Sequence, residues 1–384
     1  GNMPMNSLQG STRLFFMDNL RAIAMITGIF FHAALAYSPM AHSIWPSANP
    51  QNHWLFDLFA WGSHLFRMPV FFVMAGFFCA LVLKKSDGFT FMKNRLIRIA
   101  LPLVIFLPIL SIAMMFVIQY GLEQVQNKNP FLNFIQMLMA LPEPPAAPLN
   151  TMHLWFLYHL LFLYLLTYVG HILLSPKLAN WCTSRKPTQL LLLLIAASIP
   201  ALYAVSVPFP APEWVFPALW ALWFYGLFFA LGYGFFIKPK LIEQFEEKLP
   251  LWLVIGLITY LIYYYLLPNQ LLPEQQPQGL IKLAIIVLEA TSAVLLTLSA
   301  VLYAKRYLNS NSAFMRYISK VSYWVYIVHL PLLFFIQFLL IDVTWHMSIK
   351  FLVSSLATLT ISIISFHLLV SWTWLSRMLV SKSS

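Results

Sequence analysis

The sequence predicts an all-α, polytopic integral membrane protein with about ten transmembrane helices and both termini in the cytoplasm. Charged residues are scarce, long apolar segments recur along the chain, and basic residues gather in alternate loops. Of the 384 residues, 60% are hydrophobic and 9% are charged, whereas about a quarter of the residues of soluble domains are charged. Each apolar segment holds about 18 to 25 residues, enough for a helix to cross a hydrocarbon core of roughly 30 Å. Helices are favoured because strands of a barrel would show short alternating segments.

Ten apolar segments are expected to form the transmembrane helices. They span about 14–37, 55–83, 95–119, 152–174, 188–207, 214–237, 250–267, 280–303, 322–341 and 350–375. The longest connection, 120–150, holds the apolar run FLNFIQMLM and then PEPPAAP, and we expect it to lie on the outer surface as a lid. A single transmembrane domain is therefore expected over 14–376, between a cytoplasmic segment at 1–13 and a cytoplasmic tail at 377–384.

The distribution of basic residues sets the orientation. All but four of the 23 Lys and Arg residues fall in loops assigned to the inner side, the exceptions being Arg67, Lys128, Lys282 and Lys350. This asymmetry follows the positive-inside rule and predicts a multi-pass protein of the bacterial inner membrane. The formal charge of +11 is thus explained by orientation, and no nucleic-acid partner is expected. No metal-ligand cluster and no tightly bound cofactor are expected either, and the expected surroundings are membrane lipid.

Arg21 and His32 in the first predicted helix are the first polar residues that demand an explanation. An ionisable residue at mid-bilayer costs about 2.5 to 3.5 kcal/mol, so it needs a partner, a water-filled cavity or a function. The two are eleven residues apart, which places them within roughly 20° of each other around the axis and about 16 Å apart along it. Asp18, one turn before Arg21, could orient its guanidinium. The alternative is an arginine that reaches the interface and a histidine that is satisfied in the core.

The second predicted helix carries His64 and Arg67 in its outer half. Arg67 is not at a cytoplasmic end, and its planar guanidinium suits an anionic or carbonyl oxygen group. We expect its partner to be Glu289, the only acidic residue within the eighth predicted helix, or a carboxylate of the substrate. The alternative is a buried ion pair with a purely structural role.

Arg95 and Arg98 begin the third predicted helix one turn apart, so they face the same way at the cytoplasmic mouth. Two guanidinium groups there could bind the phosphates of a nucleotide-bearing donor, although ordinary interfacial anchoring is the alternative. Pro102 follows and is expected to kink the helix.

Two further histidines lie in predicted helices. His153 opens the fourth near the outer interface, and His329 lies in the ninth just before Pro331, which is expected to free a carbonyl that this imidazole could meet. No serine-nucleophile elbow, phosphate-binding loop or pair of carboxylates appears. A histidine general base is therefore the simplest chemistry that these residues support.

Several of these segments together resemble one known family. FFMDNLRAIAMITGIFFH resembles the first-helix signature of the membrane acyltransferase-3 family, an arginine followed eleven residues later by a histidine. FRMPVFFVMAGFF, RLIRIALP, MHLWFL and YWVYIVHLPL resemble its further signatures, in the same order and over nearly the whole chain. The pair HLFRM and MHLWFL is similar to the branch that succinylates periplasmic glucans.

The resemblance implies roles for individual residues. It implies that His32 is the catalytic histidine, that Arg21, Arg95 and Arg98 engage acyl-CoA, and that Arg67 and His153 line the path or the acceptor site. The co-substrate would be succinyl-CoA or acetyl-CoA, and the acceptor a hydroxyl of an extracytoplasmic glycan. We add His64 as a further donor to the oxyanion, and Asp18, Glu289 and His329 as supporting residues.

Two other classes of function stay open at this point. A transporter or flippase of an anionic or saccharide substrate would use the same buried arginines and histidines as a binding pocket. A scaffold in an envelope complex is a third possibility, which the short loops disfavour. Release of CoA separates the enzyme from both.

Overall fold

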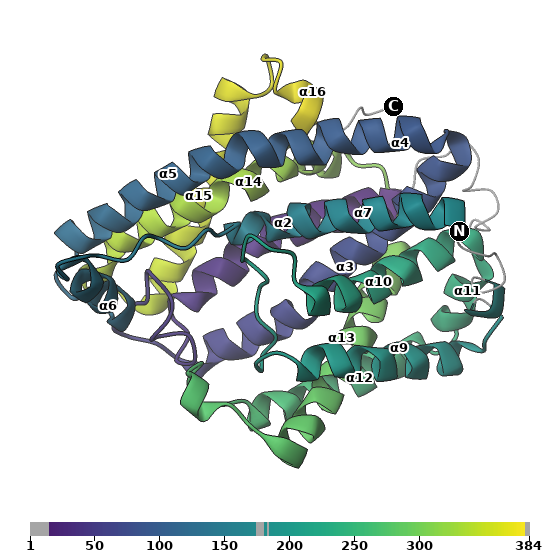
Figure 1. Cartoon of the computed structure of the whole chain (residues 1–384), viewed down its shortest axis with the longest axis horizontal. Coiled ribbons are helices and arrows are strands. Elements are labelled where there is room, and N and C mark those ends of the chain that lie inside the picture. Colours follow the sequence, from purple (N-terminus) through teal and green to yellow (C-terminus); the bar gives the residue numbers. More distant parts are fainter. Residues whose placement is uncertain (1–14, 174–179, 183, 381–384) are drawn as a thin grey trace.

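The computed structural model describes residues 15–173, 180–182 and 184–380, and the predicted segment 1–13 lies outside them. Ten long helices form the body of the protein, and their long axes run roughly side by side in Figure 1. They are α2 (Phe15–Leu35), α3 (Trp54–Lys85), α5 (Leu101–Gln124), α7 (Trp155–Leu173), α9 (Pro187–Tyr203), α10 (Leu219–Ile237), α12 (Leu249–Leu266), α13 (Gly279–Tyr307), α14 (Ala313–Ile341) and α15 (Met347–Leu369). Each corresponds to one predicted segment, and the part of the chain that is described contains no β-strand.

Within the described residues, eight helical segments are long and apolar enough to cross a membrane. The chain is therefore an all-α, polytopic membrane protein. Two of the ten helices are not among these eight. Helix α2 contains the polar residues Asp18, Asn19, Arg21 and His32, which lower its hydropathy. Helix α9 is short, with 17 residues. Ten crossings, with both termini on the cytoplasmic side, remain our prediction for the topology.

Helices α3, α13 and α14 form the interior of the bundle. In each, 78% of the most apolar window is buried, against 22% for the segment that contains α5 and 28% for α12 and α15. Helices α3 and α10 approach very closely at two glycines. A Cβ on Gly76 would lie 1.9 Å from the Phe229 carbonyl oxygen, and one on Gly232 would lie 1.7 Å from that of Val73. Small residues allow this backbone approach, which is typical of membrane helices.

The third predicted helix is longer and more irregular than expected. It begins at α4 (Gly88–Arg95), passes through a π-helical turn, η1 (Leu96–Ala100), and continues as α5. Pro102 has no N–H for the Arg98 carbonyl, and the Tyr323 hydroxyl donates to that oxygen at 2.8 Å instead. Such π-turns occur frequently at functional sites.

The predicted outer connection contains the short helix α6 (Pro130–Met139), which lies at the end of the bundle opposite the short helix α11 (Lys240–Glu246) (Figure 1). Asp342, at the end of α14, accepts hydrogen bonds from the backbone N–H groups of Gln126 and Asn127, both at 2.9 Å. The connection is therefore fastened to the bundle on one side of α6. Its action as a lid stays a prediction.

Both described ends of the chain lie at the same end of the bundle. Asn19, in the first turns of α2, donates to the Leu308 carbonyl at 2.6 Å. Arg98 donates to the Val380 carbonyl at 3.2 Å. This placement agrees with an even number of crossings.

Candidate active site

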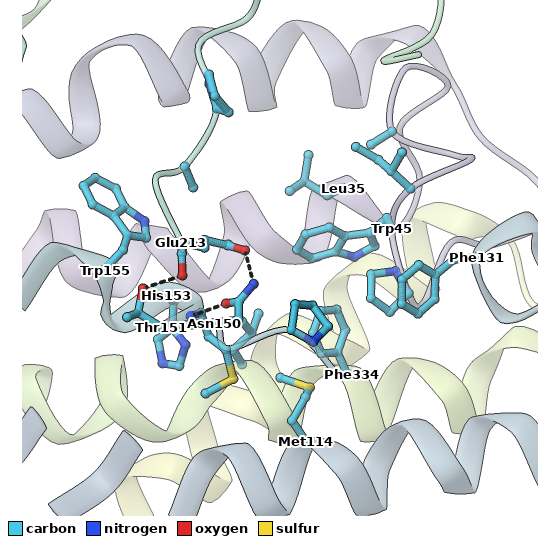
Figure 2. A pocket seen from close by; sticks show the side chains of 18 of the residues that line it. Leu35, Trp45, Met114, Phe131, Asn150, Thr151, His153, Trp155, Glu213 and Phe334 are labelled. Carbon is cyan, nitrogen blue, oxygen red and sulfur yellow. Dashed lines mark hydrogen bonds between the residues drawn. The ribbon is translucent and has the colours of Figure 1, made fainter. Parts of the chain in front are cut away.

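A cavity of about 1660 Å³ opens at the end of the bundle that carries α6 and descends between the helices. It is lined by residues of α2, α3, α5, α6 and α14 and by the connections that follow α2, α6, α9 and α12. Figure 2 shows aromatic and apolar side chains, including Trp45 and Phe334, facing Asn150 and Glu213 across this space. Among the predicted site residues, His32, His64, Arg67 and His153 line it.

His32 and His329 form a hydrogen-bonded pair at the cavity wall. The His32 Nδ1 and His329 Nε2 atoms are 2.9 Å apart, and His329 Nδ1 lies 2.7 Å from the Tyr326 carbonyl oxygen. A carbonyl only accepts, so the N–H of neutral His329 is on Nδ1 and its Nε2 accepts from His32 Nδ1–H. The lone pair of neutral His32 is then on Nε2, on a side chain that lines the cavity while His329 is buried behind it. This arrangement leaves His32 Nε2 as a base available to the cavity.

His153 is fixed by the carbonyl that Pro331 frees. Pro331 cannot donate to Ile327, four residues earlier, and His153 Nε2 donates to that carbonyl at 2.8 Å. We predicted that His329 would meet this carbonyl, and that prediction was wrong, because His329 instead donates to Tyr326. The ring of His153 packs edge-on against that of His329 with centroids 5.1 Å apart.

The peptide of Phe209 orients His64. His64 Nε2 donates to the Phe209 carbonyl at 2.6 Å, so a neutral His64 has its lone pair on Nδ1. The Phe209 N–H in turn donates to Glu289 Oε2 at 3.3 Å, and the Tyr263 hydroxyl donates to the same oxygen. Since its one N–H is committed, neutral His64 has none for an oxyanion, contrary to our expectation.

Arg67 is buried beside the cavity, and the described residues form no ion pair with it. The expected pair with Glu289 is absent among the described contacts: Oε2 of that carboxylate accepts from Tyr263 and Phe209, and its buried Oε1 has no described partner. Instead the guanidinium carbon of Arg67 lies 5.0 Å from the centre of the Phe31 ring. A Cβ on Gly28 would lie 3.0 Å from Arg67 Nη1, so this glycine leaves room for the side chain. Arg67 Nε has no described partner, and a guanidinium in this state suits an oxygen ligand.

The three arginines predicted to bind the donor gather at the other end of the bundle. Arg21 Nη2 lies 3.6 Å from Asp18 Oδ1, as predicted, and 3.5 Å from Ser319 Oγ of α14. Arg95 lies over the Tyr164 ring, 5.6 Å from its centre. Arg98 lies close enough to Arg95 and Arg21 for electrostatic repulsion. This concentration of positive charge suits a polyanion such as a nucleotide phosphate.

The predicted common face of Arg21 and His32 is confirmed by their contacts with α14. Arg21 contacts Ser319 and His32 contacts His329 on that one helix. None of the three arginines lines the cavity that contains His32. The cavity therefore reaches His32 but not these arginines, and a route for the donor stays a prediction.

Some site residues were missed from the sequence. Trp45 stacks on His32 with ring centroids 6.1 Å apart, and Thr151 N–H donates to the Glu213 carbonyl at 2.6 Å, which holds the segment before His153. Met152 has a φ of 52°, a left-handed conformation that is strained for this residue. No pattern in the sequence marks them, because they lie in connections whose pairing depends on the fold.

Comparison with known families agrees with this geometry. The chain matches the family described as Acyltransferase domain, of the acyltransferase-3 type, over residues 14–367.

The chain belongs to this family.

The resemblance predicted from its motifs is thereby confirmed, and the chain is a membrane acyltransferase.

Several relatives carry the same name. Glucans biosynthesis protein C of Salmonella paratyphi B is 28% identical over 346 residues, which cover 84% of this chain and 83% of that protein. Its counterpart in Salmonella schwarzengrund is 27% identical over 379 residues, or 93% and 91% of the two chains. No solved structure shows a significant match.

Proposed function

We propose that this acyltransferase moves an acyl group from cytoplasmic acyl-CoA to a hydroxyl of an extracytoplasmic glycan, with His32 as the general base. The observation that supports the proposal is the His32–His329 pair, which leaves the lone pair of neutral His32 on Nε2, in a side chain that lines the cavity. The names of the relatives support a glucan as the acceptor. The basic-residue asymmetry supports the inner membrane as the location.

The reaction needs one group that carries a proton from the acceptor hydroxyl oxygen to the sulfur of CoA. His32 Nε2 takes the proton of the acceptor hydroxyl while its oxygen forms a bond to the thioester carbonyl carbon. The tetrahedral intermediate then breaks its C–S bond, and the imidazolium returns the proton to the CoA thiolate. The imidazolium that forms between these steps keeps its hydrogen bond from Nδ1–H to His329, so His329 acts as a positioning residue.

Arg67 is the proposed donor to the oxyanion. Its guanidinium always carries N–H groups, is buried at the cavity and has no carboxylate partner among the described residues. His64 Nδ1 is an acceptor, so we assign it to binding of an acceptor hydroxyl. His153, at the same wall, completes the acceptor side.

Arg21, Arg95 and Arg98 are proposed to bind the phosphates of CoA at the inner mouth. The thin pantetheine arm would then pass between the helices toward His32, so that only the thioester reaches mid-membrane. The acyl group is succinyl or acetyl. The unpaired charge of Arg67 favours succinyl, whose free carboxylate it could bind when it is not engaged with an oxyanion.

The test of His32 uses a histidine outside the cavity as a control. We expect His32→Ala to lower CoA release in the presence of a glucan acceptor by at least about 10²-fold. The matched variant His42→Ala, in the connection after α2, is expected to keep wild-type turnover, because His42 does not line the cavity. Wild-type turnover in His32→Ala would remove His32 from the mechanism.

A further inference from the structure

One face of α5 lines the cavity, and its outer part also packs against apolar side chains of α14 and α6. The lining residues recur at helical spacing on this face, and we call them the α5 stripe: Leu107, Ser111, Met114, Ile118 and Leu122, flanked by Pro108, Met115 and Gln119. Figure 2 shows Met114 reaching into the cavity. The stripe covers fifteen residue steps of α5, or about 22 Å at 1.5 Å per residue.

Most of the α5 stripe lies on the outer side of the histidine pair. Two ring contacts give the register between α5 and α14, Phe106 with Trp324 at 5.4 Å and Tyr120 with Phe335 at 5.1 Å. His329 falls between these two contacts, at about the level of Ser111. The stripe therefore leads from the proposed reaction centre toward the outer end of the bundle, away from the arginines that would bind the donor.

The edge of the cavity along this stripe is apolar and exposed. Met115 of α5 is 67% exposed and Leu149, in the connection before α7, is 70% exposed, and both line the cavity. Helix α5 belongs to a membrane-crossing segment of which only 22% of the most apolar window is buried. We infer from this exposure that the edge of the cavity at Met115 faces lipid.

An apolar recess that opens to lipid favours an alkyl chain over water. Apolar cavities stay dry and bind hydrocarbon, and lipid tails are as apolar as the leucines of a helix surface. Three of the polar residues that line the cavity, His32, His64 and Arg67, would lie at one end of such a chain. An amphiphile with an apolar tail and a polar head would match the apolar stripe and these polar residues.

We propose that the α5 stripe binds the alkyl chain of an amphiphile from the outer leaflet whose saccharide head reaches His32. The inference rests on the proposed function and specifies its acceptor as a glycan carried on a lipid or alkyl anchor. Because the stripe leads outward from His32, the chain belongs to the acceptor and not to the acyl group of the donor.

The test measures how acceptor use depends on chain length. The protein in nanodiscs is given acyl-CoA and alkyl glucosides from ethyl to octyl, and KM is obtained from CoA release. Burying methylene groups predicts that KM falls by about tenfold or more from ethyl to octyl glucoside. Ser111→Trp fills the stripe and is expected to reduce this ratio to about twofold or less. The ratio within one variant cancels any general loss of activity.

Ile112→Trp is the matched control. It adds the same side chain at the next residue of α5, which is 55% exposed and does not line the cavity, and it is expected to keep the wild-type ratio. Met115→Trp is a second obstructing variant, for use if Ser111→Trp does not fold. Met115 lies at the exposed edge of the cavity, where the fold should tolerate a larger side chain. The ratio of KM for ethyl glucoside to KM for octyl glucoside could instead be equal in the wild type, both obstructing variants and the control. Partitioning of the glucoside into the bilayer would then explain the effect of chain length, and the proposal would be overturned.

Equilibrium binding of radiolabelled octyl glucoside to the same variants separates the two proposals, because it needs no turnover. Weaker binding to Ser111→Trp than to Ile112→Trp, without CoA release by any variant, would support the stripe and contradict the acyl-CoA reaction. Equal binding by all variants would overturn the stripe even where CoA release is normal.

Discussion

The histidines of the site differ in which ring nitrogen is committed to a carbonyl. His329 gives Nδ1–H to Tyr326, whereas His64 and His153 give Nε2–H to Phe209 and Ile327. His32 and His329 are in addition bonded to each other. Because His329 accepts from His32 Nδ1–H, His32 can become charged at Nε2 without losing this hydrogen bond.

Replacement of His329 tests this role. We expect His329→Ala to lower kcat by roughly 10²- to 10⁴-fold, the range of general-base catalysis, with little change in the KM of either substrate. In His329→Gln the amide oxygen can accept from His32 Nδ1–H, so partial recovery of kcat is expected. Steady-state kinetics check both, and a change confined to KM would refute a positioning role.

Glu213, which lines the cavity, is expected to make the stability of the fold depend on pH. Burial raises the pKa of this carboxyl, and the hydrogen bond from Asn150 opposes the rise only in part. A raised pKa means that the folded state binds the proton more tightly, so stability is present below the unfolded pKa and is lost as the pH rises through the folded pKa. Glu213→Gln should therefore raise the melting temperature at pH 8 and leave it unchanged at pH 4. An equal gain at both pH values would contradict this account.

At the scale of helices, prolines provide the free acceptors on which the site is built. Pro331 frees the Ile327 carbonyl for His153, and Pro102 frees the Arg98 carbonyl for Tyr323. In lipid a freed carbonyl must find a partner within the protein. Each proline thus ties together two helices that are distant in sequence.

The contact of α3 with α10 depends on its two glycines. Gly232→Ala would drive a Cβ to 1.7 Å from the Val73 carbonyl oxygen, and overpacking of this kind typically costs about 1 to 3 kcal/mol. We expect a lower melting temperature in detergent. Gly226→Ala, on the same helix, places its Cβ at an ordinary 3.4 Å from Leu163 and is the control. Equal melting temperatures for the two variants would mean that the helices separate freely.

At the scale of the whole molecule, hydrophobic segment length predicted the helices, because the bilayer sets the length of each crossing. The common face of Arg21 and His32 also followed from helical periodicity, but the helix that this face contacts did not. The partners of His153, His64 and Glu289 did not, since each depends on a backbone carbonyl or N–H of a segment distant in sequence. An arginine in a membrane suggested an acidic partner, but the hydrogen bonds described for Glu289 come from Tyr263 and Phe209, not from Arg67.

The most direct test of the account uses both sides of one membrane. Proteoliposomes with the inner face outward receive acyl-CoA outside and a glucan acceptor only in the lumen. The account predicts CoA release outside that requires the lumenal glucan and is lost in His32→Ala, together with acylated glucan inside. Movement of glucan or of acyl-CoA across the membrane without CoA release would contradict it and identify a transporter.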